Sequence, residues 1–159
     1  MLKILFVCTG NICRSPMAEG IMKKKLKLMK IRDIAVSSAG ISAFDSSKAS
    51  KKAVEISQQG GVDISEHKAR AIDEDIVERA DMILVMDSIQ KEELLTNFPK
   101  SSNKIYFLGS FLNENEEERE ILDPYGLSIY NYRLCFGELN MAIEGLLDFI
   151  MKNKNNSNQ

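Results

Sequence analysis

The 159-residue sequence has no tryptophan, one histidine, three cysteines, and no large excess of either charge. No apolar run is long enough to cross a membrane, and Met1–Val7 is too short for a secretory signal. With 21 Lys and Arg against 23 Asp and Glu, the overall balance predicts neither a nucleic-acid nor a membrane partner. Three cysteines do not make a disulfide framework, so we expect a reducing, cytoplasmic location. One histidine and this cysteine spacing give no metal-ligand set.

What is present is the composition of a globular chain, with 44% apolar residues and a length that favours one domain. We expect the domain to span residues 1–151 and the polar segment 152–159 to form a disordered tail. Short apolar runs predict four buried strands, at Ile4–Val7, Ala35–Ser38, Met82–Met86 and Ile105–Leu108. Helical patterns alternate with them, at Ser15–Met29, Ser46–Gln59, Ser88–Asn97 and Ser128–Met151.

Strands that are apolar on both faces and alternate with helices predict an α/β fold. The expected architecture is a three-layer sandwich with a central four-stranded parallel sheet. Ligands of such sheets bind beyond the carboxyl ends of the strands. Cys8 stands at such an end, in the segment C-T-G-N-I-C-R-S-P.

The residues that follow Cys8 favour the binding of an anion. Gly10 and Asn11 tolerate positive φ, which lets a loop turn its backbone N–H groups inward. A helix that starts near Ser15 adds the positive end of its dipole, and Arg14 offers a planar fork to a tetrahedral oxyanion. Such surroundings favour a cysteine thiolate. The pattern predicts a nucleophilic cysteine in an anion-binding loop; the alternative is a buried apolar cysteine followed by an ordinary turn.

The segment V-C-T-G-N-I-C-R-S-P-M-A-E resembles the phosphate-binding loop of the low-molecular-weight protein tyrosine phosphatases. Later segments are similar to segments of that family in the same order: S-S-A-G (37–40), G-V-D-I-S-E-H-K-A-R (61–70), A-D-M-I-L-V-M-D (80–87) and D-P-Y (123–125). The resemblance implies a phosphate-binding loop between the first strand and the first helix. It also implies hydrolysis through a cysteinyl-phosphate intermediate, with no cofactor and no metal.

The resemblance further assigns roles to individual residues. It makes Cys8 the nucleophile, Arg14 the residue that binds the phosphoryl group, and Asp123 the general acid for the leaving oxygen. The phosphate-binding loop would comprise Thr9, Gly10, Asn11, Ile12, Cys13, Arg14 and Ser15, supported by Ser38 and His67, with Phe44 and Tyr125 as walls for the substrate. Without the resemblance, Asp123 would be read as a turn aspartate before proline, His67 as an exposed loop residue, and the two aromatics as core.

The implied substrates are phosphotyrosine-containing proteins or peptides and small aryl phosphates, with phosphate and vanadate as inhibitors and a monomer as the expected state. Gly126, after Tyr125, also resembles the protein-arginine phosphatase branch of the family, whereas Ile12 stands where that branch has threonine. A non-catalytic phosphate-binding module is a further alternative. Cys13 either packs beneath the loop or forms a protective disulfide with Cys8. A thiol-dependent arsenate reductase is disfavoured, because no cysteine lies between Cys13 and Cys135.

Overall fold

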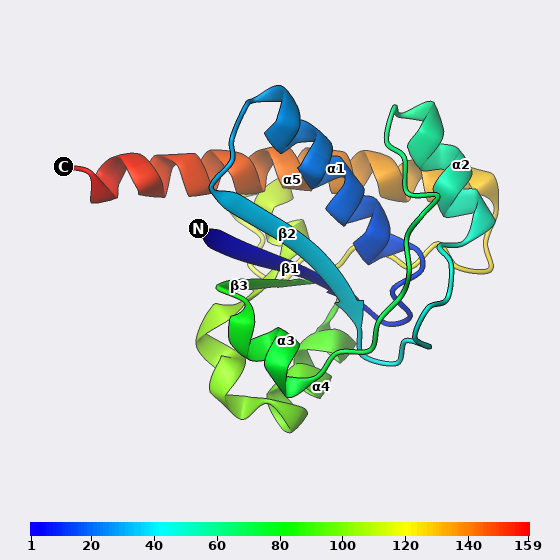
Figure 1. Cartoon of the computed structure of the whole chain (residues 1–159), viewed down its shortest axis with the longest axis horizontal. Helices are drawn as coiled ribbons and strands as arrows, with labels where there is room; N and C mark the ends of the chain where they lie inside the picture. Colours follow the sequence, from blue (N-terminus) through cyan, green and yellow to red (C-terminus); the bar gives the residue numbers. More distant parts are fainter.

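A computed structural model describes all 159 residues, built around one parallel sheet (Figure 1). The strand order is β2-β1-β3-β4. The strands are β1 (Leu2–Cys8), β2 (Ile34–Gly40), β3 (Met82–Val85) and β4 (Ile105–Phe107). Cys8 is level with Gly40 of β2, and Val7 is level with Val85 of β3. The carboxyl ends of the central strands therefore meet at one edge, where Cys8 lies.

Helices cover both faces of the sheet, which confirms the predicted three-layer α/β sandwich (Figure 1). One face carries α1 (Arg14–Leu28), α2 (Lys51–Gln59) and α5 (Ile129–Ser157); the other carries α3 (Glu74–Arg79) and α4 (Ser88–Asn97). Short 3₁₀ helices, η1 (Pro99–Lys104) and η2 (Leu108–Leu112), flank β4. Along β1, Ile4 and Phe6 pack under α1 and α5, while Leu5 and Val7 pack toward α3 and α4. This alternation is why an apolar run suits a strand buried on both faces.

Three α-helices differ clearly from the expectation. The second helix begins at Lys51 and not at Ser46, because Ser46 has φ 70° and Ser50 caps the helix by accepting the N–H of Ala53. The short helix α3 was not predicted. Where a disordered tail was expected from residue 152, α5 continues to Ser157. No helix combines the length and hydropathy that a membrane span requires.

Candidate active site

In the loop between β1 and α1, positive φ was expected to be tolerated at Gly10 and Asn11, and only Asn11 adopts it. Asn11 has φ 55°, in the left-handed region that asparagine tolerates. The backbone N–H groups of Thr9 to Cys13 donate to no group of the protein. The amino end of α1 begins at Arg14, directly after them. These donors and the helix dipole are therefore available to an anion.

A directed chain of hydrogen bonds reaches the sulfur of Cys8. Cys8 Sγ lies 2.8 Å from Ser15 Oγ, and Asn11 Nδ2 donates to Ser15 Oγ at 2.8 Å and to Ser38 Oγ at 2.9 Å. The amide orientation is fixed because Asn11 Oδ1 accepts the N–H of Arg70 at 3.0 Å. Ser15 accepts from Asn11, so its own hydroxyl hydrogen is free to point at the sulfur. Such a hydrogen bond stabilises a thiolate.

His67 and Glu19 support the loop from below. His67 Nε2 lies 2.7 Å from the carbonyl oxygen of Asn11, which only accepts, so this ring nitrogen donates. On the other side of the ring, Nδ1 is 3.8 Å from Glu19 Oε2, which also accepts the hydroxyl of Ser38 at 3.1 Å. The His67 side chain is buried, and both it and Ser38 are hydrogen-bonded to Asn11 of the loop. Glu19 was missed, because a glutamate on a helix gives no sequence signal of this contact.

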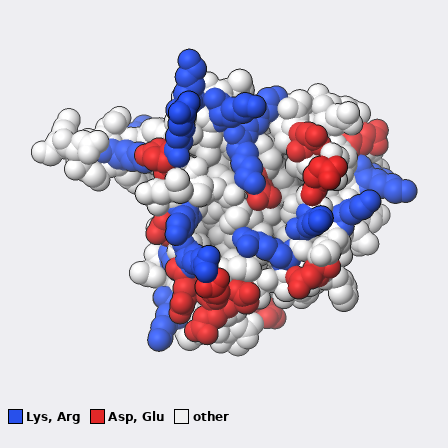
Figure 2. Space-filling model, in the orientation of Figure 1, with Lys and Arg blue, Asp and Glu red and all other residues white.

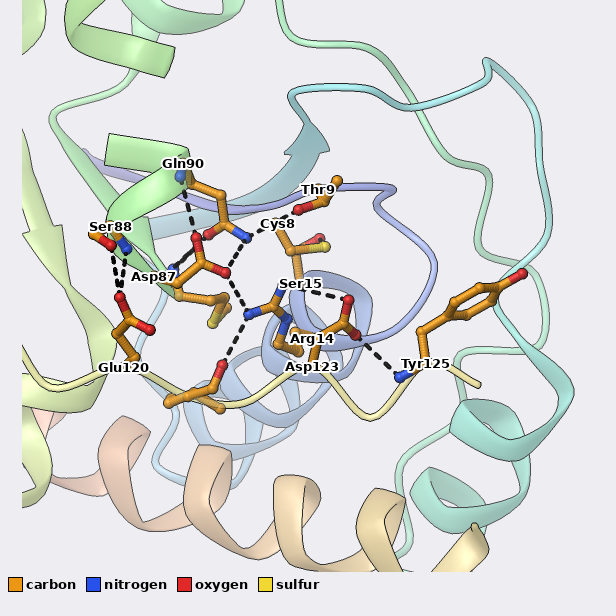
Figure 3. A network of polar contacts seen from close by, with 12 residues as sticks. Cys8, Thr9, Arg14, Ser15, Asp87, Ser88, Gln90, Glu120, Asp123 and Tyr125 are labelled. Atoms are coloured by element: carbon orange, nitrogen blue, oxygen red, sulfur yellow. Dashed lines mark hydrogen bonds and ion pairs between the residues drawn. The ribbon is translucent and has the colours of Figure 1, made fainter. Parts of the chain in front are cut away.

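Arg14 is buried and held by oxygens from distant segments (Figure 3). Its Nη1 donates to Asp87 Oδ2 at 2.9 Å and to the carbonyl of Ile121 at 2.8 Å. Its Nη2 lies 3.6 Å from Asp123 Oδ2. These partners offset the cost of burying a guanidinium and fix the orientation of its plane.

Asp87 is in turn oriented by Gln90, in the first turn of α4 (Figure 3). Gln90 Nε2 donates to Asp87 Oδ2 at 3.2 Å and to Thr9 Oγ1 at 3.4 Å. Neither Asp87 nor Gln90 was expected in the site from the sequence. Asp87 did carry a signal, because it follows β3 closely at the same sheet edge as Cys8.

The predicted catalytic residues share one pocket of about 180 Å³. Its lining is Cys8, Thr9, Gly10, Ile12, Cys13, Arg14, Asp123 and Tyr125. The Asp123 side chain is 48% exposed, and its Oδ1 accepts the N–H of Tyr125 at 3.1 Å. Phe44 does not line this pocket, contrary to expectation: it lies in the turn after β2, and 83% of it is exposed to solvent. A larger hollow of about 300 Å³ between β2 and α3 contains no cysteine or histidine.

The other two cysteines are buried and free. Burial raises the pKa of the Cys13 thiol, which lies 3.3 Å from Ser50 Oγ and 3.4 Å from the Tyr132 hydroxyl. Burial also raises the pKa of Tyr132 to about 12 and raises the pKa of Cys135. The thiols of Cys13 and Cys135 therefore stay protonated near neutral pH, and a protonated thiol is a poor nucleophile. No group of three His, Cys, Asp or Glu side chains is placed to hold a metal ion.

Comparison with known proteins agrees with this geometry. The sequence pattern of the family described as low molecular weight phosphotyrosine protein phosphatase matches residues 3–156. The probable low molecular weight protein-tyrosine-phosphatase EpsP of Ralstonia nicotianae is 42% identical over 122 residues, which cover 77% of each chain. The structure of the YwlE arginine phosphatase from Geobacillus stearothermophilus is 30% identical, with a TM-score of 0.89 over 98% of this chain and 97% of its own. The structure of the low molecular weight protein tyrosine phosphatase from T. tengcongensis is 37% identical, with a TM-score of 0.85 over 93% of this chain and 99% of its own. The chain therefore belongs to the low molecular weight phosphotyrosine protein phosphatase family.

Proposed function

We propose that this phosphatase hydrolyses phosphotyrosine in proteins or peptides, and small aryl phosphates, through a cysteinyl-phosphate intermediate. The observation that carries the proposal is the convergence of Cys8, Arg14 and Asp123 on one pocket of about 180 Å³. A nucleophile, a fixed guanidinium and a half-exposed carboxyl are the groups that hydrolysis of an aryl phosphate through a covalent intermediate needs.

In the first step, the Cys8 thiolate attacks phosphorus while the bond from phosphorus to the phenolic oxygen breaks. Protonated Asp123 gives its proton to that leaving oxygen, so a neutral phenol departs. Arg14 and the loop N–H groups stabilise the charge on the three remaining phosphoryl oxygens. Before the attack, the Ser15 hydroxyl donates its hydrogen bond to the thiolate sulfur.

In the second step, water attacks the phosphorus of the cysteinyl phosphate. The Asp123 carboxylate takes the proton of this water, and the sulfur–phosphorus bond breaks with its electrons returning to Cys8. Inorganic phosphate leaves, and the thiolate and the protonated acid are restored. One carboxyl thus serves as acid and then as base.

The test combines two substitutions with para-nitrophenyl phosphate as substrate. Cys8→Ser abolishes turnover but retains binding of phosphate or vanadate, because the backbone donors remain. Asp123→Ala lowers kcat on the order of 10²–10⁴-fold, with a smaller loss for substrates whose leaving groups need no proton. Near wild-type turnover by Cys8→Ser would exclude the covalent mechanism. An inactive wild type that still binds vanadate would favour the non-catalytic module.

A second candidate is phosphoarginine hydrolysis, which the likeness to the YwlE arginine phosphatase structure favours. Gly126, with φ 77°, also supports this candidate, since the arginine phosphatases are expected to have a glycine at this position. The pocket nevertheless includes Ile12, whose branched apolar side chain suits a flat aromatic group and offers no hydrogen bond to a guanidinium.

We therefore expect a higher kcat/KM for a phosphotyrosine peptide than for a matched phosphoarginine peptide. Ile12→Thr replaces the ethyl group of the side chain with a hydroxyl and shifts the ratio toward phosphoarginine, because a polar group at a reacting centre discriminates more strongly than a methylene. The measurement is kcat/KM for both peptides with both proteins. A wild type that prefers phosphoarginine would replace the first candidate by the second.

A further inference from the structure

Basic residues are concentrated on α1 and on the turn that follows it. The segment 20–32 contains no acidic residue and has six basic ones, Lys23, Lys24, Lys25, Lys27, Lys30 and Arg32, although the whole chain has a charge of −2. In Figure 2, Lys and Arg side chains gather over α1 and this turn. The charge balance of the whole chain, which predicted no membrane partner, conceals this local excess.

The cations at the end of the segment are not neutralised by the protein. Two lysines further up the helix are paired with glutamates. Lys27, Lys30 and Arg32 are exposed and form no ion pair. The next acidic residue, Asp33, is held by Lys154 at 2.6 Å. Three cations therefore face solvent with their charge uncompensated.

Two large apolar side chains protrude among these cations. Leu28 is 72% exposed and Met29 is 53% exposed. The helix ends in a Schellman motif, in which the N–H of Ile31 donates to the carbonyl of Leu26 at 2.9 Å. This turn directs Leu26 and Ile31 toward the core and leaves Leu28 and Met29 outside.

Lys30 occupies the left-handed position of this motif, with φ 57°. Glycine is the residue that this position favours, because a Cβ is strained there. A lysine at this place adds an exposed charge at a conformational cost. The position thus contributes to the surface charge and not to the stability of the turn.

We propose that Lys27, Leu28, Met29, Lys30 and Arg32, the basic tip, bind the surface of an anionic lipid membrane. The three cations contact phosphate headgroups, and the two apolar side chains enter the boundary between headgroups and acyl chains. A nucleic acid would attract the same cations but offers no apolar layer for Leu28 and Met29. The tip also has no aromatic side chain on which a base would stack.

The test is sedimentation of the full chain with lipid vesicles. We expect binding to vesicles of equal parts phosphatidylcholine and phosphatidylglycerol, none to phosphatidylcholine alone, and weaker binding as salt increases. Lys27→Glu with Lys30→Glu lowers the partition coefficient at least about 25-fold, since each headgroup-facing cation contributes about fivefold. The matched control, Lys51→Glu with Lys100→Glu, makes the same charge change at exposed lysines elsewhere and retains most of the binding.

Two further variants separate insertion into lipid from attraction by charge alone and from a loss of folding. Leu28→Ser with Met29→Ser lowers binding at least about tenfold without removing charge. Lys30→Gly lowers binding about fivefold while its thermal unfolding temperature stays equal or rises, which separates binding from folding. A wild type that stays in the supernatant at low salt would overturn the proposal. An equal loss of vesicle binding in the control pair would also overturn it. So would a Leu28→Ser, Met29→Ser variant whose affinities for vesicles and for duplex DNA both equal those of the wild type.

Discussion

A single buried amide, that of Gln90, connects two sides of the pocket. Its Oε1 accepts the N–H of Met86 at 2.7 Å, while its Nε2 donates to Asp87 and to the hydroxyl of Thr9. Asp87 receives Nη1 of Arg14 on the same oxygen that Gln90 contacts. Gln90 touches no reacting atom in the proposed mechanism, so it acts as a positioning residue for the guanidinium and the loop.

Gln90→Glu tests this role with almost no change in size. The acceptor for the N–H of Met86 is kept, but both donors are lost and a carboxylate faces Asp87. We expect kcat/KM for para-nitrophenyl phosphate to fall about tenfold, because a hydrogen bond to a charged group contributes about 1.5 kcal/mol. Phosphate should also inhibit less strongly, so its inhibition constant should rise by a similar factor. A merely structural role of Gln90 would not produce this change. Unchanged phosphate inhibition at a lowered unfolding temperature would restrict Gln90 to the helix cap.

At the scale of elements, apolar runs and turn chemistry were sufficient for most of the fold. The β1–α1 loop was predictable because Asn11, which takes the positive φ, and Arg14, which can bind an oxyanion, each have a local physical reason to be there. Helix α3 was not, since six residues are too few to show a helical period. The start of α2 was misplaced because several serines precede Lys51, and a sequence does not show which of them is the cap.

The residues of the site also fall into those that local sequence patterns place and those that they do not. Cys8 and Arg14 are set by one loop, so local reasoning places them together. The approach of Asp123 to Arg14 depends on the path of the chain after η2, which no local pattern determines. Phe44 illustrates the converse error: the family resemblance assigned this aromatic residue to a substrate wall, but 83% of it is exposed to solvent and it does not line the pocket. Contacts that depend on the course of long connections are therefore the part that sequence alone misses.

The packing of α5 against η2 fixes the start of the connection between η2 and α5, which contains Asp123. A Cβ on Gly145 of α5 would collide with the carbonyl oxygen of Phe111 in η2. Gly145→Ala should therefore lower the free energy of unfolding by about 1–3 kcal/mol, as overpacking usually does. Gly137 is the matched control in the same helix, because nothing lies within 4 Å of the place that an alanine methyl group would take there.

For Gly137→Ala we expect a gain of about 1 kcal/mol, the usual difference between the two residues in a helix. Urea unfolding of the two variants and the wild type is the measurement. If Gly145→Ala were as stabilising as Gly137→Ala, the close contact between α5 and η2 would be wrong.

At the scale of the whole molecule, the fold separates the pocket from the basic tip. The parallel strands end at the pocket, and α1 runs back from there toward their amino ends (Figure 1). Its 15 residues span about 22 Å, so the cations at its end lie far from Cys8. A chain held to a surface by the tip would keep the mouth of its pocket directed away from that surface.

This arrangement predicts that binding to vesicles leaves hydrolysis of a small substrate unchanged. At vesicle concentrations that sediment the wild type, its kcat/KM for para-nitrophenyl phosphate should equal that of the free protein, because neither Arg14 nor Asp123 contacts the tip. The Lys27→Glu, Lys30→Glu variant, assayed with the same vesicles, controls for effects of lipid on the substrate. If activity instead fell in proportion to the bound fraction of wild type, the pocket would face the membrane, and a surface nearer to the loop would have to be the one that binds.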